Sequence, residues 1–377
     1  MQFKSLLIDS YRQLSAAKLF WITLGLSLLV VLLFGSIGFN QQGISFFFGL
    51  WEIESEELRE GSPWARGLYI GIFSTFLVKV WLAWIATILA LISTCSIFPE
   101  FVHSGSIELT ISKPIGRLKL FFSKYLVSLL FVVLQVSIFC IGVFLCVGLR
   151  MGEWNWMLFA AIPIVTIFFS YLFSICVLVG SITKSSITAL LLTGVFWMCL
   201  WSVQSTEAVL NRFVIQQRVD IERFEEGIKT GEEEIEKIIL KSPNDSRIES
   251  RKRRLEQFKS DTEQSEELLK TLTLWHQPIS WILAISPKTS QTINLLNRWL
   301  SDPNGFDINA IMSGDMSEFD NMEEIDPTSR NAREREANKR MQEDYDTRSF
   351  WYVIGTSLIF EAFVLWIASW HFYRKDF

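Results

Sequence analysis

Long runs of apolar residues alternate with short polar stretches over the first 204 residues, and a last apolar run lies near the C-terminal end. Each run exceeds the roughly 18 residues that mark a membrane-helix candidate, and each can cross about 30 Å of hydrocarbon at 1.5 Å per residue. The runs predict spans over residues 19–38, 69–98, 125–149, 156–182, 186–204 and 350–372. The pattern therefore predicts an all-α integral membrane protein with six transmembrane helices.

A polar region of a different character separates the fifth and sixth predicted spans. Residues 205–350 hold 50 of the 75 charged residues of the chain. Two stretches in this region carry apolar residues at helical spacing, and the turn residues 242–245 separate them. The apolar positions are Ile221, Phe224, Ile228, Ile235 and Ile238 in the first stretch and Leu255, Phe258, Leu269 and Leu272 in the second. This pattern predicts an antiparallel, coiled-coil-like helical hairpin; the alternative is a pair of amphipathic helices on a small domain.

The sequence after the hairpin is more apolar again. Pro278 and Pro287 bound a run that is too short to span a bilayer, and residues 275–300 therefore either lie on the outer leaflet or form the base of the inserted domain. A polar helix over residues 328–348 is expected to lead into the last span.

The distribution of basic residues predicts the orientation of the spans. The short loops on one side carry ten Lys and Arg residues, which are Lys4, Arg12, Lys18, Lys113, Arg117, Lys119, Lys124, Lys184, Arg374 and Lys375. The short loops on the other side carry three, Arg59, Arg66 and Arg150. Because cytoplasmic loops are enriched in Lys and Arg, both termini and the loop at residues 99–124 are expected to be cytoplasmic. The region between spans five and six is then extracytoplasmic.

The predicted organisation has four parts. These are a cytoplasmic amphipathic helix (1–18), spans one to five (19–204) with a cytoplasmic segment at 97–124, an extracytoplasmic helical insertion (205–349), and the sixth span with its tail (350–377).

Composition excludes several classes of function. All five cysteines lie in predicted spans, so the insertion has no disulfide framework and no Cys/His metal spacing is present. The three histidines are scattered, no catalytic constellation occurs, and a net charge of −5 gives no reason to expect nucleic-acid binding. The chain also lacks the Gly-x-x-x-x-Gly-Lys-Ser/Thr loop that cradles nucleotide phosphates. It is therefore not expected to be an enzyme or to hold a cofactor or metal of its own.

The segment at residues 97–124 is suited to contact a cytoplasmic protein. Pro99 and Pro114 restrict helix continuation, Gly105 permits a tight turn, and the segment carries both acidic and basic residues. The alternative is an ordinary positive-inside loop whose basic residues face anionic lipid.

The order of residues in this segment resembles the coupling segment of ABC type-2 permeases. That segment has an acidic residue, a Gly-Ser pair, a Ser-Lys-Pro-Ile-x-Arg run and a following Lys. The residues expected to take part in coupling here are Glu100, Gly105, Ser106, Glu108, Ser112, Lys113, Pro114, Arg117 and Lys124. The basic amphipathic N-terminus, the six spans and the terminal residues 373–377 also resemble this family, whereas the size of the insertion departs from it.

The resemblance implies a permease subunit of an ABC exporter in the bacterial cytoplasmic membrane. Its partners would be a separate ATPase subunit that holds ATP and Mg²⁺, a second permease subunit in a homodimer or heterodimer, and membrane lipid. An alternative is an ABC-driven mechanical or assembly device that acts on an envelope partner through residues 205–349 without solute transport. A weaker alternative is a membrane scaffold that has no ATPase partner.

Two ionisable residues fall inside predicted spans, Lys79 in the second and Glu361 near the middle of the last. Isolated charges there cost at least a few kcal/mol, so each is expected to face protein, water or a partner. The two residues either pair with each other, or Glu361 lines a transport path or has a structural or conformational role. Lys79 alternatively snorkels outward from a span that begins near Val80.

Overall fold

The computed structural model describes residues 18–55, 58, 59, 62, 65, 69, 73–102, 116–152, 154, 156–242, 247–300 and 330–374. These residues form two compact units. The membrane unit contains the described residues of 18–199, 287–300 and 354–374, and the hairpin unit contains those of 200–286 and 330–353.

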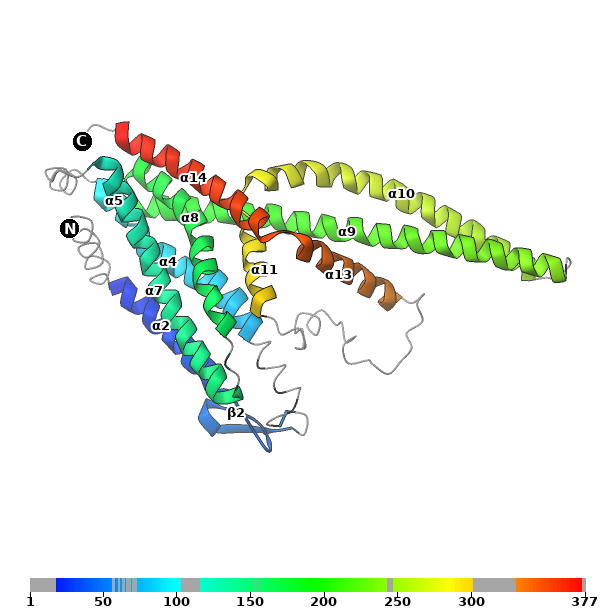
Figure 1. The fold of residues 1–377 in the computed structure, drawn as a ribbon, viewed down its shortest axis with the longest axis horizontal. Helices are drawn as coiled ribbons and strands as arrows, with labels where there is room; N and C mark the ends of the chain where they lie inside the picture. Colours follow the sequence, from blue (N-terminus) through cyan, green and yellow to red (C-terminus); the bar gives the residue numbers. More distant parts are fainter. Residues whose placement is uncertain are drawn as a thin grey trace. The chain divides into compact units, whose positions relative to one another are not determined.

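The membrane unit is built mainly from helices (Figure 1). They are α2 (Lys18–Gly35), the π-helix η2 (Phe73–Ala86), α4 (Thr87–Thr94), α5 (Ile97–Val102), α7 (Arg117–Met151), η3 (Trp156–Ala160), α8 (Ala161–Thr183), the first part of α9 (Ser186–Lys241), α11 (Thr289–Leu300) and α14 (Phe350–Arg374).

Five helical segments among the described residues are long and apolar enough to cross a membrane, which confirms the membrane class of the fold. They are Val80–Val102, Arg117–Arg150, Trp156–Thr183, Ser186–Lys241 and Phe350–Arg374. The first predicted span corresponds to a shorter apolar helix, Phe20–Gly35. The total of six spans therefore remains a prediction, and the amphipathic helix predicted at residues 1–18 lies almost wholly outside the described residues.

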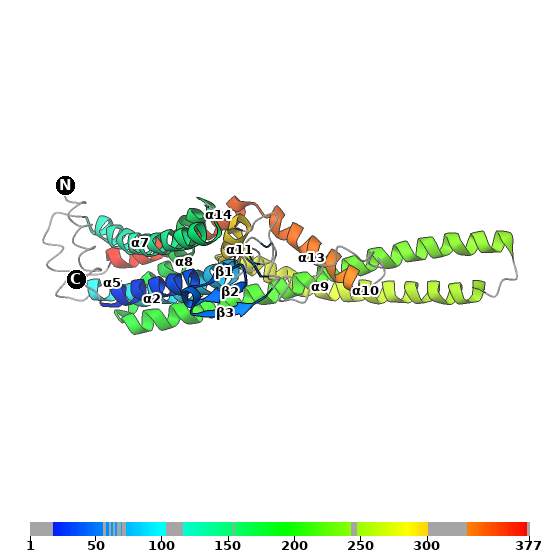
Figure 2. The ribbon, with the colours of Figure 1, turned by 90° about the horizontal axis from the view of Figure 1, so that it is seen from below.

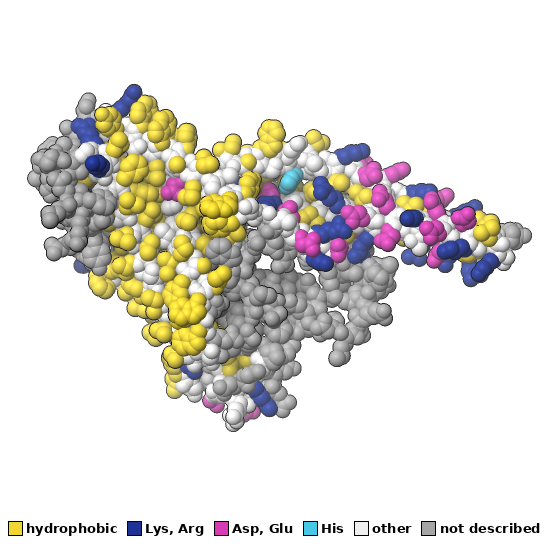
Figure 3. Space-filling model, viewed as in Figure 1, with side chains coloured by type: hydrophobic (Ala, Val, Ile, Leu, Met, Phe, Trp, Pro, Cys, Tyr) yellow, Lys and Arg dark blue, Asp and Glu magenta, His cyan; other side chains and the backbone are white. Residues whose placement is uncertain are grey.

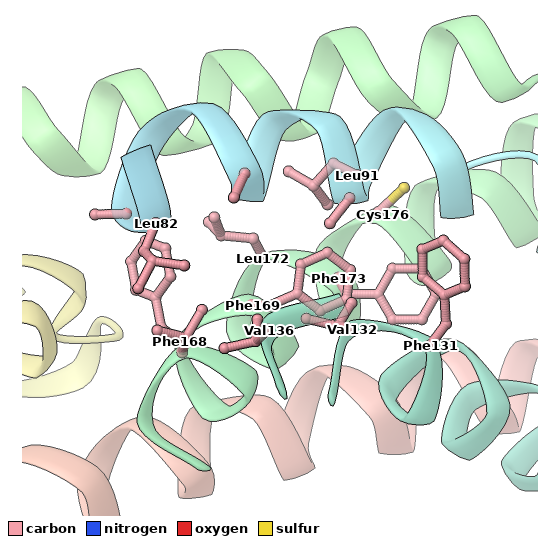
Figure 4. Close-up of a cluster of buried hydrophobic side chains, with 14 of the residues drawn as sticks. Leu82, Leu91, Phe131, Val132, Val136, Phe168, Phe169, Leu172, Phe173 and Cys176 are labelled. Atoms are coloured by element: carbon pink, nitrogen blue, oxygen red, sulfur yellow. The ribbon is translucent and has the colours of Figure 1, made fainter. Parts of the chain in front are cut away.

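The core of the membrane unit is centred on α8, which packs against α4, α5, α7, η3 and α11. Figure 4 shows Phe168, Phe169 and Phe173 of α8 pointing toward side chains of α7 and of the continuous η2–α4 helix, including Val132 and Leu82. All five side chains are buried. Close packing of this kind fixes the helices relative to one another within the unit, because interiors are packed as densely as organic crystals.

The outer faces of the same helices are apolar and exposed. In α14, Ile359, Phe363, Trp366 and Trp370 follow the spacing i, i+4, i+7, i+11 of a single helix face. Such a contiguous apolar surface is unfavourable in water and is the normal lipid-facing surface of a membrane protein. The opposite face of α14 is buried and carries Glu361.

A small antiparallel sheet follows α2 and was not predicted from the sequence. Its strands are β1 (Gly38–Asn40), β2 (Gly43–Phe46) and β3 (Trp51–Glu54), in the order β1-β2-β3, and the 3₁₀ turn η1 (Phe47–Gly49) lies before β3. Gly43 has φ +147°, and a Cβ there would lie 2.2 Å from the Ile53 carbonyl oxygen. Only glycine fits this position without moving β3.

The hairpin unit consists of the second part of α9, α10 (Arg247–Ile285) and α13 (Arg330–Thr347). The arms α9 and α10 lie side by side, as both views show (Figures 1 and 2). Phe224 and Phe258 stack with ring centroids 6.0 Å apart, and Lys259 pairs with Glu232 at 3.0 Å. Basic and acidic side chains are interspersed along these arms (Figure 3). The helical hairpin inferred from periodicity is therefore present.

Two details differ from the sequence-based expectations. Pro278 does not bound a segment but lies inside α10, which continues to Ile285. The helix α11, which follows Pro287, belongs to the membrane unit, where Thr292 and Ile293 are buried. The apolar stretch 275–300 therefore comprises two elements with different environments.

Candidate functional site

The segment assigned to coupling is described only at its two ends. Glu100 lies exposed on α5, and Arg117 and Lys124 are partly buried in the first turns of α7. The remaining residues expected to couple, Gly105, Ser106, Glu108, Ser112, Lys113 and Pro114, lie outside the described residues. The helix α7 begins at Arg117, eight residues before the predicted span, so its basic residues stand on a helix and not in a loop.

An aromatic cluster joins these two ends to the last helix. The ring centroids of Phe101 and Phe372 are 5.6 Å apart, those of Phe121 and Phe372 are 5.7 Å apart, and those of Phe98 and Phe121 are 5.1 Å apart. All four rings are buried. Aromatic pairs at such separations contribute roughly 0.5–1.5 kcal/mol each beyond the burial of their area. Displacement of α5 or of the start of α7 would therefore also displace the C-terminal turn of α14.

The basic residues at this end contact the same cluster and helix. The Arg117 guanidinium donates from Nη1 to the Tyr373 carbonyl oxygen at 3.3 Å. The Lys124 ammonium lies 5.9 Å from the Phe101 ring centroid, within reach of a cation–π interaction. Cationic side chains near a helix C-terminus are favoured by the unsatisfied carbonyls there. Arg117 thus links the start of α7 to the last turn of α14.

The helix α5 also packs tightly on α8 at Pro99. A Cβ added to Gly180 would lie 3.2 Å from Pro99 Cδ and 3.5 Å from the Ala189 Cβ. The absence of a side chain at Gly180 therefore permits the close approach of α5 and α8. This contact is the second route by which the segment at residues 97–124 is connected to the core.

Glu361 lies in a three-helix hydrogen-bond cluster and is 8 % exposed. The Tyr125 hydroxyl of α7 lies 2.7 Å from Glu361 Oε1, and the Ser170 hydroxyl of α8 lies 2.7 Å from Oε2. Ser170 Oγ is also 2.8 Å from the Ile167 carbonyl oxygen. The cluster therefore connects α7, α8 and α14 through polar contacts inside an apolar bundle.

The number of hydrogens in this cluster favours a neutral carboxylic acid. A serine hydroxyl has one hydrogen. If Ser170 donates to Ile167, its contact with Glu361 requires a hydrogen from the carboxyl group. The Tyr125 hydroxyl, which also lies 3.3 Å from the Ser170 carbonyl oxygen, supplies the hydrogen for the remaining short contact. The acid form therefore gives each of the three contacts shorter than 3 Å a donor. No ion pair to Glu361 occurs among the described side chains, which do not include that of Lys79.

Glu361 was recognised in the sequence as an ionisable residue inside a span, but its partners Tyr125 and Ser170 were not predicted. Lys288 was not predicted as a site residue. Lys288 is 3 % exposed and its ammonium donates to the Thr356 hydroxyl at 2.5 Å. Its backbone N–H donates to the Ser357 hydroxyl at 2.9 Å. These contacts attach the start of α11 to α14 within the membrane unit. The residue was missed because it lies outside every predicted span.

The hairpin unit contains a separate network of polar and charged residues. His276 Nε2 lies 3.5 Å from Glu207 Oε1, and the Arg348 guanidinium lies 3.6 Å from the same oxygen. Arg348 also pairs with Asp344 at 3.0 Å, and the Asn211 amide donates to Asp344 at 3.3 Å. The network joins the end of α13 to α9, and the His276–Glu207 contact joins α10 to the same part of α9. No group of three His, Cys, Asp or Glu side chains that could hold a metal ion occurs among the described residues.

A second ion pair fixes α13 farther along α9. The Arg340 guanidinium contacts Glu222 at 2.6 Å and Glu336 at 2.9 Å. The hydrogen bond from Arg340 lowers the pKa of the Glu222 carboxyl, and the same contact raises the pKa of Arg340. A cavity of about 340 Å³ lies beside this pair, between α9, α10 and α13, and Arg218 and His276 contribute to its wall.

Comparison with known protein families identifies the family of the chain. The family described as "ABC-2 family transporter protein" matches residues 12–377, which is nearly the whole chain and includes the insertion. No curated protein and no solved structure shows significant similarity to the chain. The family match agrees with the apolar helices of the membrane unit and with an association with an ABC ATPase subunit. The chain therefore belongs to the ABC-2 family of transporter proteins, as a membrane permease component of an ABC transporter.

Proposed function

We propose that the chain is the membrane-spanning subunit of an ATP-driven exporter and that residues 97–124 receive the motion of a separate ATPase. ATP and Mg²⁺ would be bound by that ATPase. Two permease subunits, identical or different, would enclose the path of the substrate. Both termini and the 97–124 segment would face the cytoplasm of a bacterial cell, and residues 205–349 would face outward.

The observation that carries the coupling role is the aromatic cluster between α5, α7 and α14. A segment that only bound anionic lipid would need exposed basic residues but no rigid attachment to three helices. The ends of this segment are instead packed through Phe101, Phe121 and Phe372. A force applied to the segment would be transmitted through these rings, because packed interiors transmit strain.

The placement of the ATPase can be tested by photo-crosslinking in the native complex. A photoreactive amino acid at Glu108, in the centre of the segment, is expected to crosslink to the nucleotide-binding subunit. The matched control is the same substitution at Glu54, an exposed acidic residue on β3 that the predicted topology places on the opposite side. A crosslink from position 54 and none from position 108 would reverse the topology and exclude the coupling role.

A mechanical or assembly function remains the second candidate, and the length of the hairpin favours it. The helix α9 continues 37 residues past the end of the predicted span at residue 204, and α10 pairs with it over much of that length. Transport of a solute gives no reason for two such arms, whereas contact with an envelope partner does.

A truncation guided by the hairpin contacts separates the two functions. Residues 232–254 can be replaced by a short flexible turn, because a Cβ at Gly231 would lie 3.5 Å from Leu255 and the two arms are therefore close at this layer. The lost ion pairs, Arg251 with Glu234 and Lys259 with Glu232, are exposed and contribute roughly 0–1 kcal/mol each. An exporter is expected to retain substrate-stimulated ATP hydrolysis after truncation. A mechanical device is expected to retain basal hydrolysis and lose its envelope partner.

A further inference from the structure

One face of the last three turns of α10 is apolar and exposed, although this helix belongs to the hairpin unit. Trp281 is 71 % exposed and Ile285 is 77 % exposed. The full set of exposed residues on this face is Leu274, Trp275, Pro278, Trp281, Ile282 and Ile285. We name it the α10 stripe. At 1.5 Å per residue it is about 17 Å long.

The stripe has the spacing of a lipid-facing helix surface. Its positions 274, 278, 281 and 285 follow i, i+4, i+7, i+11. The exposed face of α14 has the same spacing at positions 359, 363, 366 and 370. The opposite side of α10 is used within the protein, since Leu283 is buried and His276 contacts Glu207. The stripe is therefore an outer surface and not part of the hairpin seam.

The same face of α10 changes character abruptly toward the middle of the helix. Glu263 lies 18 residues before Trp281, which is five full turns and places it on the same side of the helix. Glu256, Glu263 and Glu267 are all exposed on this part of the face. Lys259 and Lys270 are exposed on the same part of the face, which is therefore charged with both signs. No Asp, Glu, Lys or Arg occurs between Lys270 and Lys288. A change from charged to Trp-containing apolar residues along one face is the pattern of a helix that passes from water into the interface of a bilayer.

The chain that follows the stripe is part of the membrane unit. Directly after Ser286 and Pro287, Lys288 is held by Thr356 and Ser357 of α14. The stripe is thus continuous in sequence with a segment packed on a membrane helix. Lipid is the occupant that accounts for both the tryptophans and this continuity.

We propose that residues 274–285 of α10 lie in the headgroup–acyl boundary of the bilayer, with Trp281 and Ile285 in contact with phospholipid. The inserted domain then has a membrane-bound base, which would fix the point at which its hairpin leaves the bilayer. The proposal concerns lipid contact alone and does not depend on the ATPase or on the substrate.

Photo-crosslinking in lipid nanodiscs tests this contact on the full-length chain. p-Benzoylphenylalanine replaces Trp281, one aromatic side chain for another, and in a matched control replaces Glu263 on the same face. Trypsin releases the two sites on different peptides, residues 271–288 and 260–270, so phospholipid adducts can be assigned by mass. Adducts at position 281 are expected to exceed those at 263 by at least about tenfold, since only an interfacial residue meets acyl chains.

Two results would overturn the proposal. Adduct yields that are equally low at the two positions would place the stripe in water. A crosslink from position 281 to a second copy of the chain, in place of lipid, would make the stripe a subunit interface.

Discussion

Replacement of Glu361 tests whether the buried cluster contains a neutral acid. In the acid form, the carboxyl group accepts a hydrogen bond from Tyr125 and donates one to Ser170, at 2.7 Å each. Glu361→Gln preserves this pattern, because its amide has one acceptor oxygen and an NH₂ donor. Glu361→Leu has similar size but leaves the Tyr125 hydroxyl only its longer contact, 3.3 Å to the Ser170 carbonyl oxygen.

The expected magnitudes follow from these contacts. Glu361→Leu removes two buried hydrogen bonds, which contribute about 0.5–1.5 kcal/mol each. It is therefore expected to destabilise by about 1–3 kcal/mol in total, and Glu361→Gln by less than about 0.5 kcal/mol. Because removal of both partners is nearly neutral, Tyr125→Phe is expected to cost less in the Glu361→Leu background than in the wild type. The coupling in this double-mutant cycle is expected to be about 1–2 kcal/mol.

Thermal unfolding in nanodiscs measures these differences. A chain of this size is expected to lose roughly 2 °C in Tm per kcal/mol, so Glu361→Leu lowers Tm by about 2–6 °C while Glu361→Gln leaves it unchanged. Ala362→Leu, on the exposed face of the same turn, is the control for added bulk. A loss for Glu361→Gln as large as that for Glu361→Leu would refute the neutral acid, because only a carboxylate would then satisfy the cluster.

Two further variants test the packing of α5 and the attachment of α13. Gly180→Leu is expected to separate α5 from α8 and to destabilise the protein by about 1–3 kcal/mol, whereas Gly194→Leu, where a Cβ meets nothing within 4 Å, is expected to have no such effect in thermal unfolding. If the two variants lose the same stability, the contact at Gly180 has no special role in the packing of α5 on α8. The pKa of the Glu222 carboxyl is lowered in the folded state by its pair with Arg340. The stability that this pair contributes is therefore fully present above the ordinary carboxyl pKa of about 4.3. It is lost as the pH falls through the lowered pKa of the folded state. Hydrogen-exchange protection of α13 is therefore expected to fall a few-fold at most below about pH 4, since exposed pairs contribute little, and Glu222→Gln is expected to abolish this pH dependence. If the protection of α13 falls by the same factor in Glu222→Gln, the pH dependence arises from another titratable group.

The larger elements could be predicted because their signals are local. A run of apolar residues identifies a membrane helix without any knowledge of its partners. Likewise, the 3/4 spacing through Phe224 and Phe258 predicts the two arms of the hairpin, and these rings stack in the structure. The sheet at residues 38–54 was missed because its strands have three or four residues each, too few to establish an alternating pattern.

The site residues could be identified from the sequence only in part, because their partners are distant in the chain. A carboxylate in an apolar helix is visible in the sequence, and Glu361 was identified in this way. Its partners Tyr125 and Ser170 lie 236 and 191 residues away, and their residue types are common in membrane helices. The same limit applies to Phe372 and Phe101, whose contact depends on how α14 packs against α5.

ATP hydrolysis by the native complex with charges reversed in the coupling segment tests the central claim most directly. Glu100 and Arg117 lie within the segment, toward its two ends. Glu100→Lys with Arg117→Glu is expected to lower the yield of co-purified ATPase or its hydrolysis rate about tenfold, which corresponds to the loss of one or two charge-assisted contacts. Glu54→Lys, outside the segment, is expected to leave both unchanged. If the double variant keeps the same amount of bound ATPase and the same rate as the wild type, the segment at residues 97–124 does not couple this permease to ATP hydrolysis.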